Sequence, residues 1–489
     1  MSSKVIEGLE PETLWTRFHE ICQIPRPSKG EEQIRAYLRN FAAVRNLKMK
    51  EDKVGNIVIN LEPTKGCEKA PTLVLQSHVD MVCEKNKDKV HDFNNDPISL
   101  LREGDWIKAD GTTLGADNGI GAAAALAVAS DYTINHGPIE LLFTVDEETG
   151  LTGANNLQKD YIKGKYLLNL DTEEDGAFYV GCSGGLDTAG IYKIEWTELK
   201  DGFIPLLLSI GGLKGGHSGI NIGEKRGNAI KFLCYLLNDL RQIDFQLGNI
   251  SGGSKRNAIP REAEALIFVK PEDESKVREL INGFSLAAVI EYKGLDDGIK
   301  ITLERKESGN YQKVFDKEFS QKIINALLAL PHGTIAMSAD INGLVETSTN
   351  LATVTMSDDE IIIGTSQRSS IESAKRNIAA SVKAVLELAG AQVKNSDGYP
   401  GWQPNLDSKL LKIAKQVFTK TFGHEPEMKA VHAGLECGIL GDKYPGLEMI
   451  SFGPTIEGAH SPEERVNITA VKNFYVLLKA IIEEISFKK

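Results

Sequence analysis

The chain has 489 residues, 41% of them hydrophobic and 25% charged, a composition typical of a globular protein long enough for two domains. Its 56 basic and 68 acidic side chains give a net charge of -12 without a long basic run, which excludes a nucleic-acid or anionic-membrane partner. The N-terminal segment lacks an apolar signal region, and no apolar run reaches the roughly 18 residues of a membrane span, so we expect a cytoplasmic protein whose six cysteines are reduced.

Helix and strand patterns alternate through the first part of the chain. Helical spacing of apolar residues is followed by short apolar runs that are typical of buried strands. The predicted elements are helices at 12–24, 30–44 and 119–131, and strands at 55–62, 71–82, 139–150 and 166–175. This order predicts an α/β fold whose central sheet is mostly parallel and flanked by helices.

A glycine-rich stretch at 181–190 indicates a crossing into a second unit. Beyond it, strands and helices follow in the order strand, helix, strand, strand, helix, strand about twice, which favours an inserted α+β domain built of two related halves. The last hundred residues return to the first pattern. We therefore predict a first domain at 1–186 and 389–489, interrupted by an insert at 187–388.

Three of the predicted strands stay apolar until their carboxyl ends and then stop in acids or histidine. In an open parallel sheet, ligands bind in the crevice at these ends. Two more polar positions, Asp117 in a loop before a helix and His460 after a late strand, can converge on the same crevice. The strand-end residues are His78, Asp80, Asp146, Glu147, Glu148 and Asp171.

Each of these signals has a simpler explanation when taken alone. A histidine at a strand end is more often hydrogen-bonded to a nearby carboxylate, an acidic pair is more often a solvated turn, and Asp, Asn and Gly are ordinary turn residues. Their shared position argues for a site. So many carboxylates in one crevice are costly to bury unless cations neutralise them, and imidazole and oxygen ligands suit Zn²⁺, Mn²⁺ or Co²⁺. Five ligands suffice for two metals if one carboxylate bridges them.

At this point the sequence resembles a known family. The motifs SHVDMV, GADNGIG, DEETG, NLDTEE, GGHSG and GAHSPEE follow one another as they do in the aminoacyl-histidine (Xaa-His) dipeptidases, a branch of the di-zinc peptidases that also includes glutamate carboxypeptidases and aminoacylases. The resemblance covers essentially the whole chain. It implies a zinc-peptidase-like catalytic domain interrupted by a lid domain, in a cytosolic enzyme that is often a homodimer.

The resemblance also implies roles for the residues of the first domain. Asp117 becomes the bridging carboxylate, His78 and Asp171 complete one metal site, and Glu148 and His460 complete the other. Asp80 becomes the partner that orients the His78 ring. Glu147 becomes the general base that activates a metal-bridging water to attack the peptide bond. We expect Glu147 and Glu148 to point in opposite directions, as adjacent side chains of an extended segment do.

Within the insert, the resemblance assigns His217 as a donor to the tetrahedral oxyanion, and Asn257 and Arg368 as substrate contacts. It also assigns Gly434, which follows the insert, as a substrate contact. Arginine has the fork geometry that a substrate carboxylate requires. Two positions depart from the family pattern: Ser366 stands where an acid is common, and Ala352 stands where glycine is expected. His432 has no assigned role, but its neighbours mark it for attention.

The resulting hypothesis is a two-metal dipeptidase that acts on small Xaa-His dipeptides, β-alanyl-histidine among them, with zinc as the expected metal and cobalt or manganese as alternatives. An aminoacylase or carboxypeptidase acting on other small amides is the alternative within the same chemistry. A non-catalytic relative is the alternative outside it. Because Glu147 and all five ligand positions are present, the sequence favours an enzyme.

Overall fold

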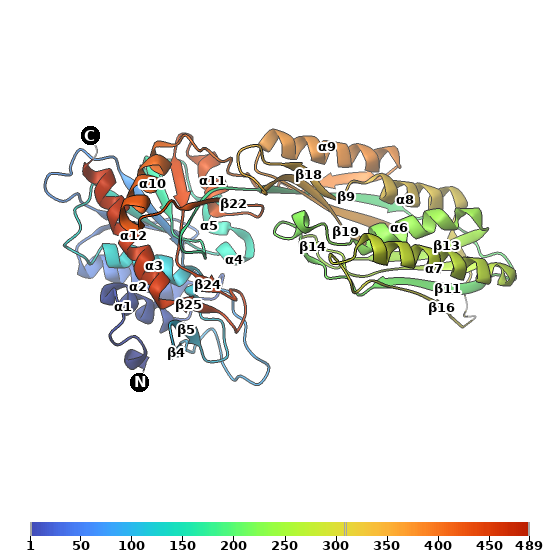
Figure 1. The fold of residues 1–489 in the computed structure, drawn as a ribbon, viewed down its shortest axis with the longest axis horizontal. Coiled ribbons are helices and arrows are strands. Elements are labelled where there is room, and N and C mark those ends of the chain that lie inside the picture. The colour runs from blue at the N-terminus through green and yellow to red at the C-terminus, as the bar shows by residue number, and fades with distance from the viewer. Residues whose placement is uncertain (1, 308, 310, 488–489) are drawn as a thin grey trace. The chain divides into compact units, whose positions relative to one another are not determined.

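The structure is a computed structural model that describes residues 2–307, 309 and 311–487. The chain divides into two compact units (Figure 1). Unit 1 consists of Met1–Gly181, Pro404–Ala430 and Leu435–Lys489, and unit 2 of Cys182–Gln403 and Val431–Gly434. A second unit is thus inserted into the first, as the sequence predicts.

An eight-stranded sheet forms the centre of unit 1. Its four middle strands, in the order β6-β3-β7-β23, are parallel, whereas the pairs β1-β2, β2-β6 and β23-β8 are antiparallel. Every residue of β3, β6 and β7 is buried, as expected for central parallel strands. In spatial order the strands are β1 (Lys48–Glu51), β2 (Ile57–Leu61), β6 (Ile139–Thr144), β3 (Leu73–His78), β7 (Tyr166–Asn169), β23 (Glu448–Ser451), β8 (Ala177–Cys182) and β22 (Glu427–Val431).

Helices and a small second sheet complete unit 1. The helices are α1 (Glu12–Cys22), α2 (Glu32–Val44), α3 (Ala116–Val128), α4 (Glu147–Gly150), α5 (Thr152–Asn156), α10 (Lys409–Phe422), α11 (Glu436–Lys443) and α12 (Ile468–Phe487), with the 3₁₀ helix η1 (Ser2–Val5). The second sheet has the order β24 (Ile456–Glu457), β25 (Arg465–Asn467), β5 (Trp106–Ala109) and β4 (Leu100–Glu103). The predicted α/β architecture is confirmed.

The start of helix α3 positions Asp117. Its run of alanines is almost completely buried, because small side chains let the helix pack closely on β3, β6 and α1. The helix does not start regularly: Asp117 has φ -78° and ψ 112°, which is extended rather than helical. The Asp117 side chain is therefore directed by the loop and not by the helix that follows.

A second, nine-stranded sheet forms unit 2. Its first half has the spatial order β16-β11-β15-β13 and its second half the order β19-β20-β9-β21, with β18 added beside β19. Its strands are β9 (Gly184–Lys193), β11 (Ile204–Gly211), β13 (Phe245–Gly252), β15 (Ala263–Val269), β16 (Lys300–Arg305), β18 (Gly333–Met337), β19 (Val345–Met356), β20 (Glu360–Ser369) and β21 (Gln392–Asn395). When the strands of each half are numbered along the chain, the spatial order in the second half is the reverse of the order in the first half. β9 is then the first strand of the second half.

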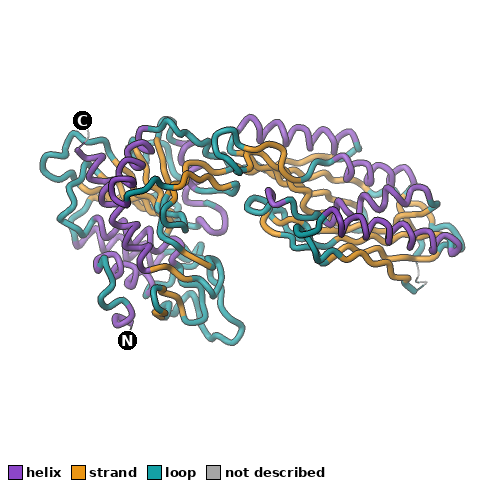
Figure 2. The backbone as a smooth tube through the Cα atoms, viewed as in Figure 1, coloured by secondary structure: helices purple, strands orange, loops and turns teal. Residues whose placement is uncertain are grey.

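Four helices pack against this sheet and share one hydrophobic core with it (Figure 2). They are α6 (Ala229–Asp239), α7 (Glu274–Glu291), α8 (Lys317–Ala329) and α9 (Glu372–Leu388). The remaining elements of unit 2 are the strand pairs β10 (Trp196–Glu198) with β17 (Lys313–Phe315) and β12 (Gly216–His217) with β14 (Ala258–Ile259), and the 3₁₀ helices η2 (Ile222–Glu224), η3 (Leu240–Gln242) and η4 (Pro271–Asp273).

The chain returns to unit 1 after Gln403, whereas the sequence predicts the return after residue 388. The reason is β21 (Gln392–Asn395), which pairs with β9 and so keeps this segment in the second sheet. The short stretch Val431–Gly434 also belongs to unit 2.

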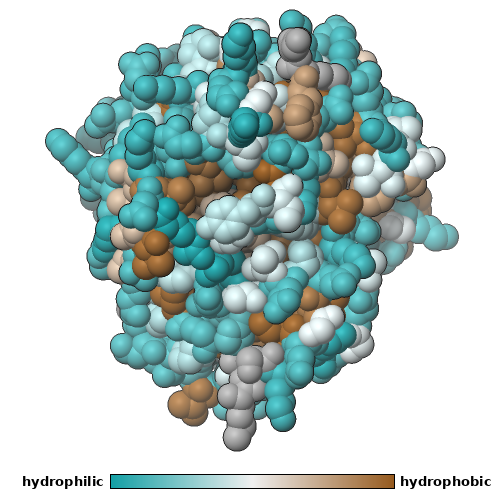
Figure 3. Space-filling model, turned by 90° about the vertical axis from the view of Figure 1, so that its left-hand side faces the viewer, coloured by the Kyte–Doolittle hydropathy of each residue, from teal (hydrophilic) through white to brown (hydrophobic). Residues whose placement is uncertain are grey.

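The surface face shown in Figure 3 is mostly hydrophilic, with separate apolar patches. Within the described part of the chain, no helix combines the length and the apolar character that crossing a membrane requires.

Candidate metal centre

The polar strand ends of unit 1 meet at one edge of its sheet. β6, β3 and β7 are neighbours, and their carboxyl ends present Glu147 and Glu148, His78, and Asp171. Asp117 joins them from the start of α3, and His460 from the loop that follows β24. The structure thus brings together all five residues that the resemblance assigns to metal binding.

His78 is the centre of a first group of ligand atoms. Its Nε2 lies 3.1 Å from Oδ1 of Asp117 and 3.3 Å from Oδ1 of Asp171. All three side chains are largely buried: the exposed fractions are 1% for His78, 15% for Asp117 and 5% for Asp171. One imidazole and two carboxylates that converge at this distance have the geometry of a metal site in which ligand atoms face a common point.

His460 is the centre of a second group. Its Nε2 lies 3.2 Å from Oδ2 of Asp117 and 3.1 Å from Oε2 of Glu148. Asp117 therefore turns one carboxylate oxygen to each histidine, so that the two groups share it. This is the arrangement that a carboxylate bridging two metals requires.

The buried carboxylates of this site carry negative charge that a bound cation would neutralise. Oε1 of Glu148 is buried and has no hydrogen-bond partner among the described residues. Burial raises the pKa of Asp171 to about 6, although His78 opposes the shift, and burial raises the pKa of Glu147 well above its ordinary value. Hydrogen bonds to Asp117 and Glu148 raise the pKa of His460 to about 11. These shifts describe concentrated negative charge that divalent cations would neutralise.

Glu147 and Glu148 do not lie on an extended segment, so the expectation that they point in opposite directions is wrong. They begin the short helix α4, after Asp146 in the left-handed region with φ 49°. Side-chain oxygens of both glutamates come within 4.8 Å of a ring nitrogen of His78 and of each other. The division of roles between them thus rests on the resemblance and not on their direction along the chain.

Asp80 connects two of the converging segments. Its Oδ1 lies 3.3 Å from Nδ1 of His78, and its carboxylate accepts hydrogen bonds from the backbone N–H groups of Glu147 and Glu148 and from Ser28 Oγ. Burial opposes the charged form, but the contact with His78 and these donors lower the pKa of Asp80 to about 2. Asp80 thereby ties the end of β3 to the start of α4.

Two further buried residues support the centre, and the sequence analysis missed them. Glu464 accepts four backbone N–H groups, from Leu114 to Asp117, at 2.7 to 3.2 Å. Arg26 donates to the carbonyl oxygens of Val79, Asp80 and Gly115. The only sequence signal for Glu464 is its place at the end of the GAHSPEE motif, and Arg26 has none.

A third acidic group, Glu31, Asp80 and Asp146, is fully buried but does not resemble a ligand set. Hydrogen-bond donors already occupy these carboxylates: Glu31 accepts from the N–H of Asp146, and Asp146 accepts from Thr149 and Thr152. The group therefore holds the turn before α4 in place.

The predicted residues of the insert lie in unit 2. His217 is in β12, and Asn257, which is exposed, accepts the N–H of Ser218 through its backbone carbonyl oxygen. Nδ1 of His217 accepts the N–H groups of Gly219 and Ile220, both at 3.2 Å. Because Nδ1 accepts, the ring proton sits on Nε2, which makes His217 a neutral hydrogen-bond donor.

Arg368 in β20 is a buried cation whose side chain donates to a neutral tyrosine hydroxyl and, among the described residues, pairs with no carboxylate. It is 7% exposed, it donates to Tyr399 Oη at 2.7 Å, and within the described part of the chain its Nε has no hydrogen-bond partner. No ion pair between Arg368 and an acid occurs among the described residues. A buried guanidinium without an anion is a candidate receptor for a substrate carboxylate.

Tyr399 links Arg368 to Gly434 and is a further residue that the sequence analysis missed. A Cβ at Gly434 would lie 2.9 Å from the Tyr399 ring, and a Cβ at Gly185 would lie 2.6 Å from it. The ring is thus held between two glycines, and its hydroxyl fixes the guanidinium of Arg368. The two positions that depart from the family pattern lie in paired strands of the sheet. Ser366 of β20 is opposite Asn350 of β19, and Ala352 lies at a register shift of β19.

Burial lowers the pKa of three histidines of unit 2: His217 and His332 to about 4, and His432 to about 3. His432 is 6% exposed and its Nε2 lies 2.7 Å from Ser348 Oγ. An unfolded histidine titrates near pH 6.5, so below about that pH the unfolded chain binds more protons than the folded unit. The free energy of unfolding of unit 2 should therefore fall as the pH falls from about 7 toward 4.

Urea unfolding midpoints at pH 7.5 and 5.0 measure this effect. We expect His432→Gln to reduce the loss of stability between the two pH values, and the matched substitution of the exposed His424 to leave that loss unchanged. The same pH dependence in wild type and His432→Gln would show that this histidine does not drive it.

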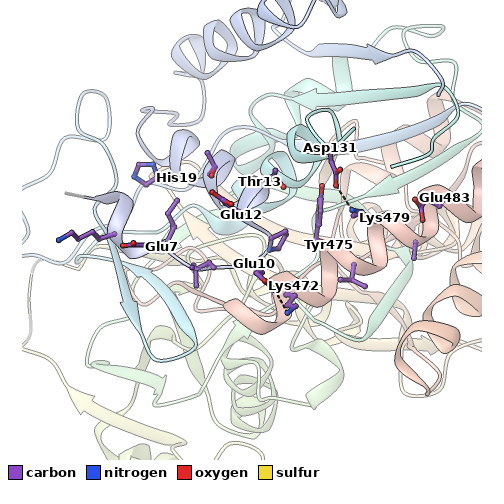
Figure 4. A pocket seen from close by; sticks show the side chains of 18 residues that line it. Glu7, Glu10, Glu12, Thr13, His19, Asp131, Lys472, Tyr475, Lys479 and Glu483 are labelled. Carbon is purple, nitrogen blue, oxygen red and sulfur yellow. Dashed lines mark hydrogen bonds and ion pairs between the residues drawn. The ribbon is translucent and has the colours of Figure 1, made fainter. Parts of the chain in front are cut away.

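A cavity of about 1300 Å³ in unit 1 lies between the N-terminal segment and α12 and not at the metal centre (Figure 4). Two of the lysines that line it are already paired, Lys472 with Glu10 and Lys479 with Asp131, both at 2.8 Å. None of the ligand groups found among the described residues includes a side chain that lines it. The cavity is therefore separate from the chemistry described above.

A fold with an inserted α+β unit and two histidine-carboxylate groups that share an aspartate defines a metallohydrolase. The model of peptidase family M20/M25/M40 matches residues 74–484, and the chain belongs to this family. It is a metallopeptidase.

Individual relatives match nearly the whole chain. The chain is 40% identical over 484 residues to the cytosol non-specific dipeptidase of Escherichia coli, covering 99% of each protein. It is 41% identical to the aminoacylhistidine dipeptidase of Vibrio alginolyticus, with a TM-score of 0.90 over 98% of this chain and 97% of that one. The aminopeptidase PepT of Bacillus cereus has the same fold, with a TM-score of 0.57 at 18% identity over 98% of this chain and 99% of that one.

Proposed function

We propose that this metallopeptidase hydrolyses dipeptides, Xaa-His dipeptides among them, with two divalent cations held by His78, Asp117, Glu148, Asp171 and His460. The observation that carries the proposal is the sharing of Asp117, whose two carboxylate oxygens face His78 and His460 separately. The names of the Escherichia coli and Vibrio alginolyticus relatives support a dipeptide substrate. Zinc suits the ligand set best, and cobalt or manganese would also fit it.

The bound cations would supply Lewis acidity to polarise the scissile carbonyl and make water more acidic. The chain itself supplies the proton transfer. We assign Glu147 as the general base, which takes a proton from the attacking water and returns it to the leaving amine. Burial raises the pKa of Glu147 above its ordinary value, which makes its carboxylate a stronger base for this proton transfer.

Two residues of unit 2 are proposed to bind the substrate. His217, as a neutral Nε2–H donor, would stabilise the negative charge that develops on the carbonyl oxygen. Arg368 would bind the free carboxylate of the dipeptide, because it is buried, unpaired by any acid in the described chain, and already oriented by Tyr399. Asn257 and Gly434 are proposed as further substrate contacts.

Arg368→Lys tests the carboxylate assignment. Lysine keeps the charge but loses the fork, so we expect KM for glycyl-histidine to rise about tenfold to a hundredfold, the value of charge-assisted hydrogen bonds, with a smaller change in kcat. The control is glycyl-histidine amide, which lacks the carboxylate. Wild type and variant should hydrolyse the amide with similar kcat/KM, and an equal loss on both substrates would contradict the assignment.

The function itself is tested by release of free histidine. Zinc-reconstituted protein should release histidine from glycyl-histidine and β-alanyl-histidine, and a panel of dipeptides without histidine would measure how broad the specificity is. Hydrolysis of N-acetyl amino acids in place of dipeptides would favour an aminoacylase. Release of the terminal residue from longer peptides would favour a carboxypeptidase.

The assembly and location of the protein are also proposals. We propose a homodimer in the cytoplasm, supported by the resemblance to the dipeptidase family and by the description of the Escherichia coli relative as a cytosol protein. Light scattering of the purified protein would measure a mass near twice the 53.5 kDa of one chain if the dimer forms.

A further inference from the structure

We propose that Glu436 is a positioning residue for the metal centre: a buried anion beneath the ligands that helps to balance the charge of the cations and holds the two strands that end at His78 and Glu147. The inference rests on the proposed two-metal function.

Glu436 is the first residue of α11 and is completely buried. Its Oε2 accepts hydrogen bonds from Gln76 Nε2 at 2.6 Å and from Thr144 Oγ1 at 2.7 Å. Gln76 lies in β3 two residues before His78, and Thr144 is the β6 residue that pairs with His78 in the sheet. One carboxylate oxygen therefore connects the ends of both strands that lead into the centre.

The hydrogen bonds continue across the sheet. Gln76 Oε1 accepts from Asn169 Nδ2 at 2.5 Å, and Asn169 Oδ1 accepts from Ser451 Oγ. Together with Thr144, these side chains form a fully buried polar row over β6, β3, β7 and β23, just below the metal ligands. Because Glu436 can only accept when ionised, it determines which end of the Gln76 amide faces it and so the direction of the whole row.

The charge of Glu436 has no partner of opposite sign within the described ion pairs, and its Oε1 is buried without a hydrogen bond. Burial raises the pKa of Glu436 to about 7; the hydrogen bond from Thr144 and the charge of His78 oppose the shift, and Asp171 and Asp80 add to it. A buried carboxylate in this position is costly unless cations lie nearby. The same electrostatic attraction that would stabilise Glu436 would strengthen metal binding.

Glu436→Gln tests the charge with almost no change of shape. We expect the affinity for Zn²⁺, measured by competition with a chromophoric chelator, to fall about 10- to 100-fold, the range typical of residues behind a ligand, with two ions still bound at saturation. Thr144→Val is the matched control, because it removes one hydrogen bond to Glu436 but leaves the carboxylate and its bond to Gln76 in place, and its Zn²⁺ affinity should change by less than about threefold. Glu436→Asp, which keeps the charge, should restore part of the affinity.

The outcomes separate the two hypotheses. A wild-type chain that binds no divalent cation would overturn the proposed function. A wild type that binds two ions, with Glu436→Gln binding them equally tightly, would overturn this inference alone. If Glu436→Gln does not fold, the comparison of Glu436→Asp with Thr144→Val decides: a large loss of Zn²⁺ affinity in Thr144→Val, equal to that in Glu436→Asp, would mean that packing and not charge is responsible.

Discussion

Glu147→Gln should lower kcat for glycyl-histidine by about 10²- to 10⁴-fold, the usual contribution of a general base, while the protein still binds two zinc ions. Glutamine has nearly the shape of glutamate but cannot accept the proton of the attacking water. The measurement is release of histidine under saturating substrate, together with zinc content after dialysis.

Zinc content is the decisive control, because the structure leaves two roles open for this residue. An oxygen of Glu147 lies within 4.8 Å of ligand atoms of His78 and Glu148, so that it is close enough to be counted with them. Loss of activity at full zinc content would support the general base. Loss of one zinc ion in Glu147→Gln would make it a ligand, and unchanged kcat would mean that another group takes the proton.

Asp117→Ala should abolish activity and weaken the binding of both metal ions. Its two oxygens face Nε2 of His78 at 3.1 Å and Nε2 of His460 at 3.2 Å, so that one substitution removes a ligand from both groups. We expect each affinity to fall more than about 100-fold, since even residues behind the ligands are worth about 10- to 100-fold. Isothermal titration of the metal-free protein with Zn²⁺ measures both sites.

His460→Ala is the matched variant, because His460 contacts Asp117 and Glu148 but belongs to only one group. It should lose one ion and keep the other at His78 and Asp171. If Asp117→Ala and His460→Ala lose the same number of ions, the result contradicts a bridging role for Asp117.

The strand ends were predictable because their pattern is local. A run such as Leu73, Val74 and Leu75 is buried wherever it lies in a parallel sheet, and the residue at its carboxyl end must then face the crevice. The amino-acid sequence alone therefore predicts that His78 and Asp171 lie at the crevice. The direction of Glu147 and Glu148 was not predictable from strand alternation, because Asp146 turns the chain into a helix at that point.

The spatial order of the insert was only partly predictable. The alternation of strands and helices indicated two related halves, but it could not show that β9, which precedes the first half in the chain, completes the second half. Pairing between strands that are far apart in sequence depends on complementary faces, and a sequence pattern read one segment at a time contains no such information.

The fold class, the presence of an insert and the residue types that gather at the carboxyl edge of the first sheet follow from the amino-acid sequence alone, because burial and strand alternation act on neighbouring residues. The tertiary structure adds that Glu464 accepts the N–H of Asp117 from 347 residues away and that Glu436 lies beneath both strands, and it gives the direction in which each Asp117 oxygen faces. These contacts depend on side-chain direction between distant segments, and packing alone sets that direction.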